Sequence, residues 1–386
     1  MLINRRHLLH AAAASGLYSL LPSLTLAATA MDKRLVVIIQ RGGMDSLDAV
    51  QPWGDPAFKL LRPNTELIAP APAFAVDNFF AFNDALKPLH SLFEAKELSV
   101  VHSVSTPYRA RSHFDAQDFL ERGADDHSNL ESGWVNRLIT LLGGRKVEFA
   151  ADIGTGASYI MRGPAPTLNV YPKSDLSFWA DSTQFLQLLY QNDPAYKSVL
   201  DSIEATGTEK PDKSNPDHAS ATHEVAALAA KMLKQDCRIA AFSLYGWDTH
   251  AQQTNNLKKS LAELSDAITT LKAELGEVWA NTLVVVASEF GRTAHFNGTG
   301  GTDHGTGGAA FFAGGLMAGG QGGKIITTRW PGVADDKLFE GRDLNPTDDV
   351  RRYIGWALAS FYDLSPDKLT STIFPGLDMG QQLRMI

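Results

Sequence analysis

Residues 238–288 constrain the fold of this chain more than any other stretch of its sequence. Two short apolar runs, Arg238–Tyr245 and Thr282–Ser288, have the composition of buried parallel strands. Between them, apolar residues recur at steps of three and four from Leu257 to Trp279, which aligns them along one side of a helix. A strand, a long helix and a second strand form a crossover unit, so we expect the two strands to be parallel.

Other stretches repeat these patterns. Leu35–Gln40 and Leu98–Val104 are also short, apolar and ended by turn-forming residues. A further helix is predicted over Asp349–Tyr362, where Pro346-Thr347-Asp348 forms a start signal. The chain has 386 residues, 44% of them hydrophobic, which is enough for a large core. We therefore predict an α/β fold with a mainly parallel central sheet and helices on both of its faces.

Residues 145–235 differ from the rest of the chain. Strand signals are weak there, glycine and proline are scattered, and residues 206–220 form a polar run that is typical of a surface loop. We interpret 145–235 as an insertion in, or a cap on, one α/β domain that spans residues 31–386.

Residues 1–30 have the pattern of an export signal rather than of a folded element. A basic start with Arg5 and Arg6 precedes a modest apolar stretch, and Ala28-Thr29-Ala30 fits a cleavage site. The paired arginines favour a twin-arginine signal, and an ordinary secretory signal or an uncleaved anchor are the alternatives. No later segment reaches the roughly 18 consecutive apolar residues of a membrane helix. We therefore expect the mature protein to be in the periplasm or secreted.

Charge and cysteine content exclude several functions. The formal net charge is −8, from 35 basic and 43 acidic residues, and becomes −10 when Arg5 and Arg6 leave with residues 1–30. An acidic protein without runs of lysine and arginine is a poor candidate for sequence-independent nucleic-acid binding. Cys237 is the only cysteine, so no intrachain disulfide can form. Its apolar neighbours indicate a buried strand residue rather than a catalytic thiol.

Acidic and imidazole side chains follow the predicted strands, where open α/β sheets collect ligands and catalytic groups. Asp248 and His250 are one residue apart after a strand, so in an extended backbone both can reach one ion; alternatively, Asp248 caps the next helix. His304 lies in the glycine-rich tract 301–305 (GTDHG), where we expect a metal ligand or a general acid or base. Asp303 is either a second ligand or the partner that orients a histidine.

Two more carboxylates occupy similar positions. Glu289 follows the last predicted strand, and it either forms a structural ion pair with Arg292 or binds a metal while Arg292 clamps an anion. Asp45 follows the first strand and the pair Gly42-Gly43. The dinucleotide pattern Gly-x-Gly-x-x-Gly is absent, so we do not expect a dinucleotide here. Arg41 or the loop amides can hold an anion instead, or Asp45 can hold a cation.

Ser112 is the candidate nucleophile. It opens the predicted helix His113–Arg122, where the positive end of the helix dipole suits an attacking alkoxide or an anionic substrate. The alternative is an N-cap serine without a chemical role. Arg109, Arg111 and His113 lie close in sequence and would supply positive charge to an oxyanion.

Several short motifs together resemble one family. They are RGGMDS at 41–46, SHFDAQDF at 112–119, WDTH at 247–250, SEFGRT at 288–293, GTDHG at 301–305, Arg342-Asp343 and Phe374-Pro375-Gly376. They are similar to the bacterial exported family called Domain of Unknown Function 1501, over essentially the whole mature chain. In fold, that family resembles the alkaline phosphatase and sulfatase superfamily. Members of that superfamily hold one or two divalent metals at the carboxyl edge of a mainly parallel sheet, and a Ser, Thr or formylglycine attacks phosphorus or sulfur.

The resemblance implies roles by position. Asp45 would be the metal carboxylate after the first strand, and Ser112 would be the nucleophile at its helix start. The other implied metal ligands are Asp248, His250 and His304 for one ion and Glu289 at the place of a second.

Three departures from the superfamily narrow the prediction. Asp248 and His250 are separated by one residue instead of three, and Glu289-Phe290 replaces an adjacent Asp-His pair, which removes one nitrogen ligand. The run 106–109 (TPYR) lacks the cysteine of the sulfatase signature Cys-x-Pro-x-Arg. We therefore expect one metal site rather than two, with Zn ahead of Mn, Ca or Mg, and no formylglycine.

These observations lead to one hypothesis and one alternative. The hypothesis is an exported metal-dependent hydrolase of phosphate or sulfate esters, acting on a small anionic ester or a polysaccharide. The metal would activate Ser112 or a water, and Arg109, Arg111 or Arg292 would neutralise charge in the transition state. The alternative is a catalytically silent envelope protein that binds a polysaccharide or a protein partner, which the reduced ligand set favours.

Overall fold

The computed structural model describes residues 32–62, 74–124, 130–154, 156–170 and 221–386. The expected export signal at residues 1–30 and the polar run at 206–220 lie outside the described residues. The strands are β1 Arg34–Gln40, β2 Val50–Gln51, β3 Ala81–Phe82, β4 Leu98–Ser105, β5 Ala150–Ile153, β6 Leu168–Val170, β7 Ile239–Leu244, β8 Thr282–Ser288, β9 Gly308–Ala313, β10 Ile325–Ile326 and β11 Asp348–Asp349.

Helices alternate with these strands along the chain. The α-helices are α3 Ser46–Ala49, α4 Phe58–Leu61, α5 Lys87–Glu94, α6 His113–Arg122, α7 Trp134–Leu141, α10 Ala221–Leu233, α11 Gln253–Leu275, α12 Val350–Tyr362 and α13 Pro366–Lys368. Short helical turns are η2 Asp84–Leu86, η3 Val147–Phe149, η4 Tyr159–Met161, η5 Gly276–Asn281, η6 Gly315–Gly319, η7 Asp335–Lys337 and η8 Leu369–Ile373. In the part of the chain that the structure covers, no helix combines the length and the apolar character needed to cross a membrane.

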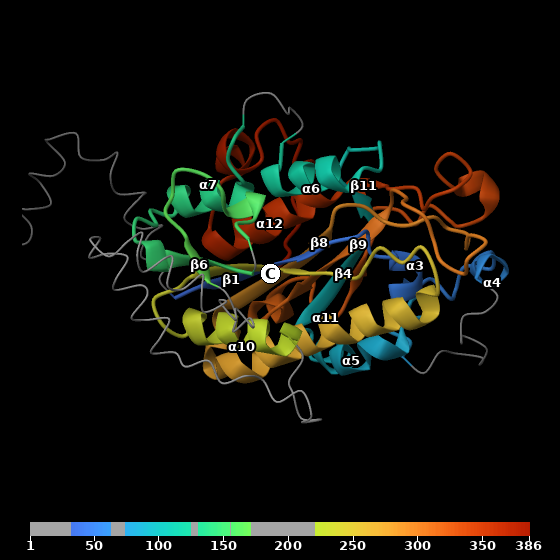
Figure 1. The fold of residues 1–386 in the computed structure, drawn as a ribbon, viewed down its shortest axis with the longest axis horizontal. Coiled ribbons are helices and arrows are strands. Elements are labelled where there is room, and N and C mark those ends of the chain that lie inside the picture. The colour runs from blue at the N-terminus through green and yellow to red at the C-terminus, as the bar shows by residue number, and fades with distance from the viewer. Residues whose placement is uncertain (1–31, 63–73, 125–129, 155, 171–220) are drawn as a thin grey trace, which may run out of the picture.

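A nine-stranded sheet forms the centre of the described residues (Figure 1). Its order is β10-β4-β9-β8-β1-β7-β5-β6, and β11 pairs with β4. The first strand, β1, lies between β7 and β8 and pairs with both in parallel. The crossover predicted over 238–288 is confirmed, because α11 connects β7 to the parallel strand β8 across β1.

The sequence does not predict β9, which runs antiparallel to both of its neighbours, β8 and β4. Its sequence, GAAFFA, contains no β-branched residue and follows a glycine-rich tract, so it carries a weak strand signal. The strand β4 therefore has the direction of β1 but does not pair with it. The sheet is mainly parallel, as predicted.

Helices cover both faces of the sheet, as Figure 1 shows with α6, α7 and α12 on one side and α5, α10 and α11 on the other. Each face of the sheet has its own hydrophobic core. Leu35, Val37 and Ile39 of β1 pack in the core that includes α7 and α12, whereas Val36 and Ile38 pack in the core that includes α5, α10 and α11. Successive side chains of a strand point to opposite faces. A strand that is covered on both faces is therefore apolar throughout, which explains why β1 gives so clear a signal.

The described ends of residues 145–235 belong to the core rather than to a cap. The strand β5 pairs in parallel with β7 and with β6, so β5 and β6 together extend the sheet by two strands. The helix α10 packs in the same core as α11. These strands have only four and three residues, which is why the sequence shows weak signals. Residues 171–220 lie outside the described residues, so an insertion there stays a prediction.

Cys237 is buried just before β7, as expected. Burial raises the pKa of its thiol to about 11. Because only the thiolate is a good nucleophile, this cysteine is a structural residue.

His102 of β4 is completely buried and neutral. Its Nδ1 accepts the amide of Ser103 at 2.8 Å, and its Nε2 lies 3.2 Å from the carbonyl oxygen of Ser46 and 3.0 Å from that of Val50. Carbonyl oxygens only accept, so Nε2 carries the proton. Burial lowers the pKa of His102 to about 4, although the two carbonyls and the nearby Asp45 carboxylate act in the opposite direction.

We predict that His102 lowers the stability of the protein in acid. An unfolded histidine has a pKa of about 6.5, so the stabilisation is complete above that pH and is lost as the pH falls towards 4, by about 3 kcal/mol. His102→Gln should remove this part of the pH dependence of the free energy of unfolding, measured in urea at neutral pH and at about pH 4. His223→Gln, on α10, is the control and should keep it. An unchanged pH dependence in His102→Gln would contradict the prediction.

Candidate metal centre

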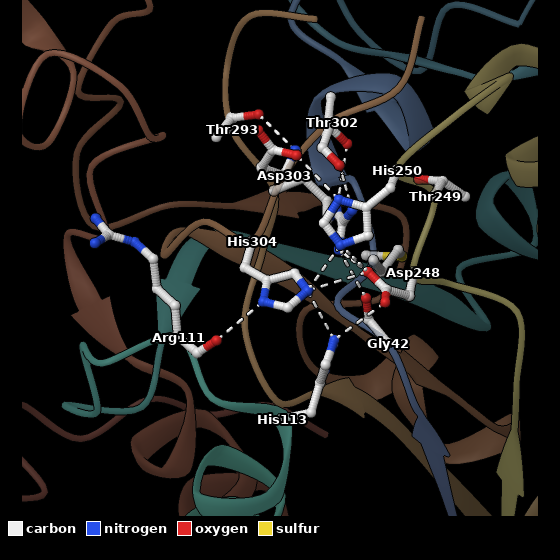
Figure 2. A network of polar contacts seen from close by, with 12 residues as sticks. Gly42, Arg111, His113, Asp248, Thr249, His250, Thr293, Thr302, Asp303 and His304 are labelled. Carbon is white, nitrogen blue, oxygen red and sulfur yellow. Dashed lines mark hydrogen bonds and ion pairs between the residues drawn. The ribbon is translucent and has the colours of Figure 1, made fainter. Parts of the chain in front are cut away.

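Side chains from three separate segments meet beyond the carboxyl ends of the central strands (Figure 2). Asp248 and His250 follow β7, Asp303 and His304 lie between β8 and β9, and His113 is the first residue of α6. Because β1, β7 and β8 are parallel, the loops that follow them emerge at the same edge of the sheet.

Two imidazole nitrogens, from His113 and His250, and one carboxylate oxygen of Asp248 all lie close to Nε2 of His304. Nε2 of His304 lies 3.0 Å from Nε2 of His113 and 3.0 Å from Nε2 of His250. Oδ1 of Asp248 lies 3.2 Å from Nε2 of His304 and 3.0 Å from Nε2 of His250. The donor atoms of His113, Asp248 and His304 all lie within 4.8 Å of one another. The structure thus brings together the predicted ligands Asp248, His250 and His304.

The other ring nitrogen of each histidine has its own acceptor. Nδ1 of His113 lies 2.9 Å from Oε1 of Glu289, and Nδ1 of His250 lies 3.0 Å from Oδ1 of Asp303. Nδ1 of His304 lies 3.0 Å from the backbone oxygen of Arg111, whose side chain points away from the imidazoles in Figure 2. Ionised carboxylates and carbonyls only accept, so each Nδ1 is the donor, and in the neutral imidazole each Nε2 then carries the lone pair.

This arrangement of lone pairs fits a bound cation. Lone pairs that face one another at 3.0 Å repel unless a proton or a metal cation lies between them. In a tetrahedral zinc site with Zn–N bonds of about 2.0–2.1 Å, neighbouring ligand atoms are ~3.3 Å apart, close to the distances seen here. Histidine ligands of metals commonly donate their other N–H to a carboxylate or a carbonyl, as all three do here.

Electrostatics prepares these side chains for the role of ligands. Burial alone would raise the pKa of the Asp248 carboxyl, but the hydrogen bond and charge of Arg292 and the nearby imidazoles outweigh it, so the pKa is lowered. The hydrogen bond to Glu289 raises the pKa of His113 despite partial burial, which makes its free nitrogen a stronger donor to a metal. Burial lowers the pKa of His304, so its neutral form is favoured.

Glu289 and Arg292 have separate partners. Oε1 of Glu289 accepts the amide of Gly42 at 2.8 Å and Nε2 of Gln117 at 3.0 Å, besides His113. Burial opposes ionisation of Glu289, but these hydrogen bonds outweigh it and lower its pKa. The structure places Glu289 behind His113, not among the converging ligand atoms. The ion pair with Arg292 that the sequence allowed is absent from the described residues, since Arg292 pairs with a different carboxylate.

Arg292 holds Asp248. Its Nη1 lies 2.6 Å from Oδ1 of Asp248 and 3.2 Å from the backbone oxygen of Gly42, and the guanidinium is fully buried. Asp303 lies 3.0 Å from Nδ1 of His250 through its Oδ1, which is the contact expected of the second of its two predicted roles. Hydrogen bonds from Asn297 and His250 lower the pKa of Asp303.

Asp45 is another predicted ligand that the structure does not bring to the centre. It is the N-cap of α3 and accepts the amides of Leu47 at 3.0 Å and Asp48 at 3.2 Å. Its other oxygen pairs with the buried guanidinium of Arg62 at 2.8 Å. Aspartate is a favoured N-cap because it satisfies free amides at a helix start. The prediction that Asp45 is a metal ligand is therefore not supported. Asp45 instead anchors the loop that follows β1.

Comparison with known proteins places the chain in a family. A family model described as a protein of unknown function (DUF1501) matches residues 103–347. The chain belongs to this family. The matched range is shorter than the span of the motifs in the sequence, which begin at residue 41. A comparison with curated proteins finds none that matches the chain.

Solved structures with a similar course of the chain come from several organisms. The C-terminal periplasmic domain of EcEptC from Escherichia coli is 10% identical, with 90% of this chain and 87% of that chain covered and a TM-score of 0.40. The alkaline phosphatase from the Antarctic bacterium TAB5 is 14% identical, with 73% and 91% covered and a TM-score of 0.34. PsFucS1 sulfatase from Pseudoalteromonas sp. is 13% identical, with 94% and 77% covered and a TM-score of 0.36. Similarity at this level decides neither activity nor substrate.

Within this DUF1501 member, the other predicted site residues have different surroundings. Ser112 stands at the N-cap of α6, but its side chain makes no capping hydrogen bond, and the Tyr108 hydroxyl lies beside it. The guanidinium of Arg109 donates to acceptors of its own loop, 105–108, so the structure does not direct it to the centre. Arg111 contributes its backbone oxygen rather than its charge.

His113 lies among the candidate ligands, although the sequence places it only among the positive charges near Ser112. A signal for its role exists in the spacing of α6. His113 and Gln117 are one helical turn apart and share a face of the helix, and both contact Glu289. An imidazole whose Nδ1 donates to a buried carboxylate is typical of an oriented metal ligand rather than of a free charge.

Two glycines of the tract 301–305 permit close backbone approach. A Cβ on Gly301 would lie 2.2 Å from the carbonyl carbon of His250, and one on Gly305 would lie 2.4 Å from that of Arg292. Both contacts are with backbone, which cannot turn aside as a long side chain can. These glycines therefore let the loop that carries His304 lie directly against its neighbours.

We predict that Gly305→Ala destabilises the protein by about 1–3 kcal/mol, because the added methyl group must displace backbone. Gly298→Ala is the matched control, since its Cβ would meet no atom within 4 Å. The free energy of unfolding in urea measures both effects. Equal stabilities of the two variants would contradict the close approach that the structure shows.

Proposed function

We propose that the protein is an exported metal-dependent hydrolase of phosphate or sulfate esters. The observation that supports this most lies beyond the carboxyl ends of the sheet, where the donor atoms of His113, Asp248 and His304 lie within 4.8 Å of one another and His250 lies beside His304. Open α/β sheets place catalytic groups at such an edge. The expected export signal lies outside the described residues and enters the proposal from the sequence.

The donor set favours zinc. Imidazole nitrogens with a carboxylate suit tetrahedral Zn²⁺, whereas Ca²⁺ and Mg²⁺ prefer six or more oxygen ligands or several waters. Mn²⁺ also prefers oxygen-rich sites. Glu289 and Asp303, which a second ion would need, each hold the Nδ1 of a histidine. We therefore propose one site with zinc as the metal.

His113 supports a functional centre rather than a catalytically silent one. The resemblance to the alkaline phosphatase and sulfatase superfamily leaves the ligand set one nitrogen short, at Glu289-Phe290. His113 offers a third imidazole from a different element, α6, and Glu289 holds its far side. His113 can thus replace the missing nitrogen ligand, which weakens the argument for the catalytically silent alternative.

A divalent cation at this point would polarise an ester oxygen and lower the pKa of a hydroxyl or water beside it. Ser112 is the proposed nucleophile, since it directly precedes His113 and its hydroxyl is not used to cap α6. Free amides at the start of that helix favour an anionic group. Arg292 is fully buried and donates to Asp248, so we assign it to holding this ligand rather than to clamping substrate.

We predict that protein purified from the periplasm contains about one equivalent of zinc, measured by inductively coupled plasma mass spectrometry. His113→Ala and His304→Ala each remove a nitrogen donor, so most of the metal should be lost. His295→Ala changes an exposed histidine that pairs with Asp335, and it should keep the metal. Natively purified wild-type protein without a divalent metal would end the proposal.

We predict that the zinc-loaded protein hydrolyses at least one ester in a panel of aryl phosphates and aryl sulfates. His304→Ala should lower kcat/KM by about 100-fold or more, because the centre loses a ligand. If Ser112 is the nucleophile, Ser112→Ala should lose activity to a similar extent. Retained activity in Ser112→Ala would point to attack by a metal-activated water. Fully loaded protein that hydrolyses no ester would favour the silent envelope protein.

A further inference from the structure

A buried ion-pair cluster stands where β1 ends. Arg62 bridges two carboxylates, with Nη2 at 2.8 Å from Oδ2 of Asp45 and Nη1 at 2.9 Å from Oδ2 of Asp48. Gln253, the first residue of α11, is completely buried beside them. Its Nε2 donates to Oδ2 of both carboxylates at 2.7 Å.

The other end of the Gln253 amide faces the metal centre. Its Oε1 accepts the hydroxyl of Thr249 at 2.9 Å and the hydroxyl of Thr302. Thr249 stands between the two centre residues that follow β7, and Thr302 directly precedes Asp303-His304 (Figure 2). One buried side chain therefore contacts both of the loops that carry the converging ligands.

Hydrogen bonds continue from Thr302 to a ligand atom. Oγ1 of Thr302 accepts Nε of Arg292 at 3.2 Å, and Nη1 of Arg292 donates to Oδ1 of Asp248 at 2.6 Å. The partners also determine how the amide of Gln253 is turned. Carboxylates need its nitrogen and the two hydroxyls need its oxygen, so a reversed amide would set oxygen against oxygen.

We propose that Gln253 is a positioning residue of the metal centre. It ties the loops after β7 and β8 to the Asp45–Asp48–Arg62 cluster, which is itself fixed at the end of β1. Through Thr302 and Arg292 it also sets the position of the Asp248 carboxylate. Residues that hold ligands in place contribute strongly to metal affinity. The inference rests on the proposed function, because it assumes that the centre binds a metal.

Thr302 offers a matched pair of variants for the test. Thr302→Val keeps the shape of the side chain and removes the hydroxyl, whereas Thr302→Ser keeps the hydroxyl. The Zn²⁺ dissociation constant of the whole protein is measured by competition with a chromogenic chelator, and the visible spectrum of the Co²⁺ form is recorded. Thr302→Val should weaken Zn²⁺ binding by about 10- to 100-fold and alter the Co²⁺ bands, while Thr302→Ser should resemble the wild type.

Two further variants complete the design. Gln253→Met removes the amide at similar length and should weaken binding as Thr302→Val does. Thr270→Val, a buried threonine of α11 that contacts His223, is the control and should bind Zn²⁺ normally. If Gln253→Met does not fold, the Thr302 pair decides.

The outcomes separate the two proposals. A wild-type protein that binds neither Zn²⁺ nor Co²⁺ overturns the proposed function. Normal wild-type binding with unchanged affinity and spectrum in Thr302→Val overturns the positioning role alone. Equal losses in Thr302→Val and Thr302→Ser would also overturn it, because the hydroxyl would then not be the cause.

Discussion

Lone pairs on three imidazole nitrogens, with a carboxylate oxygen beside them, repel one another at the 3.0–3.2 Å separations of this centre. The surrounding structure is organised so that this arrangement nevertheless holds. Glu289, Asp303 and the backbone oxygen of Arg111 each bind one Nδ1, which turns each Nε2 towards the same point. The protein thus directs its acceptors to the outside of the histidines and leaves the inside to a positive charge.

Sheet topology brings these groups together. The loops after β7 and β8 flank the loop after β1, because the crossover through α11 places β8 on the far side of β1 from β7. Close contact between these loops then requires glycine, which has no side chain, at the points where their backbones meet. Gly42 has a φ of +126°, and a Cβ there would lie 2.5 Å from the amide nitrogen of Asp248, so no other residue fits without displacement. Glycines at strand ends, which resemble a phosphate-binding turn in sequence, serve here to pack three loops against one another.

The sequence predicts the strands that are apolar throughout and the ligands that directly follow them. It predicts Asp248, His250 and His304 because residue type and strand position suffice for these. It does not distinguish the proposed ligands from the residues that hold them, since both groups consist of carboxylates and imidazoles. In the structure, Glu289 contacts Nδ1 of His113, and Nε2 of His113 lies beside His304. That distinction depends on which nitrogen faces inward, a property of packing between distant segments. The sequence does not predict the antiparallel strand β9 for a related reason. Its residues include none that is β-branched, and the strand is defined by its pairing with β4 and β8.

Charge balance accounts for why a divalent ion suits this centre. Asp248, Glu289 and Asp303 all have lowered pKa values and are ionised, and Arg292 adds one positive charge. With the histidines neutral, as metal ligands must be, three negative charges and one positive leave −2. A divalent cation brings the centre to neutrality. The protein as a whole is acidic, with a net charge of −8, and does not attract anions from a distance. In the proposed function, recognition of an anionic ester would then rest on short-range contacts with the ion and with the amides at the start of α6. Such contacts tolerate little displacement, which is why the residues that hold the ligands matter as much as the ligands themselves.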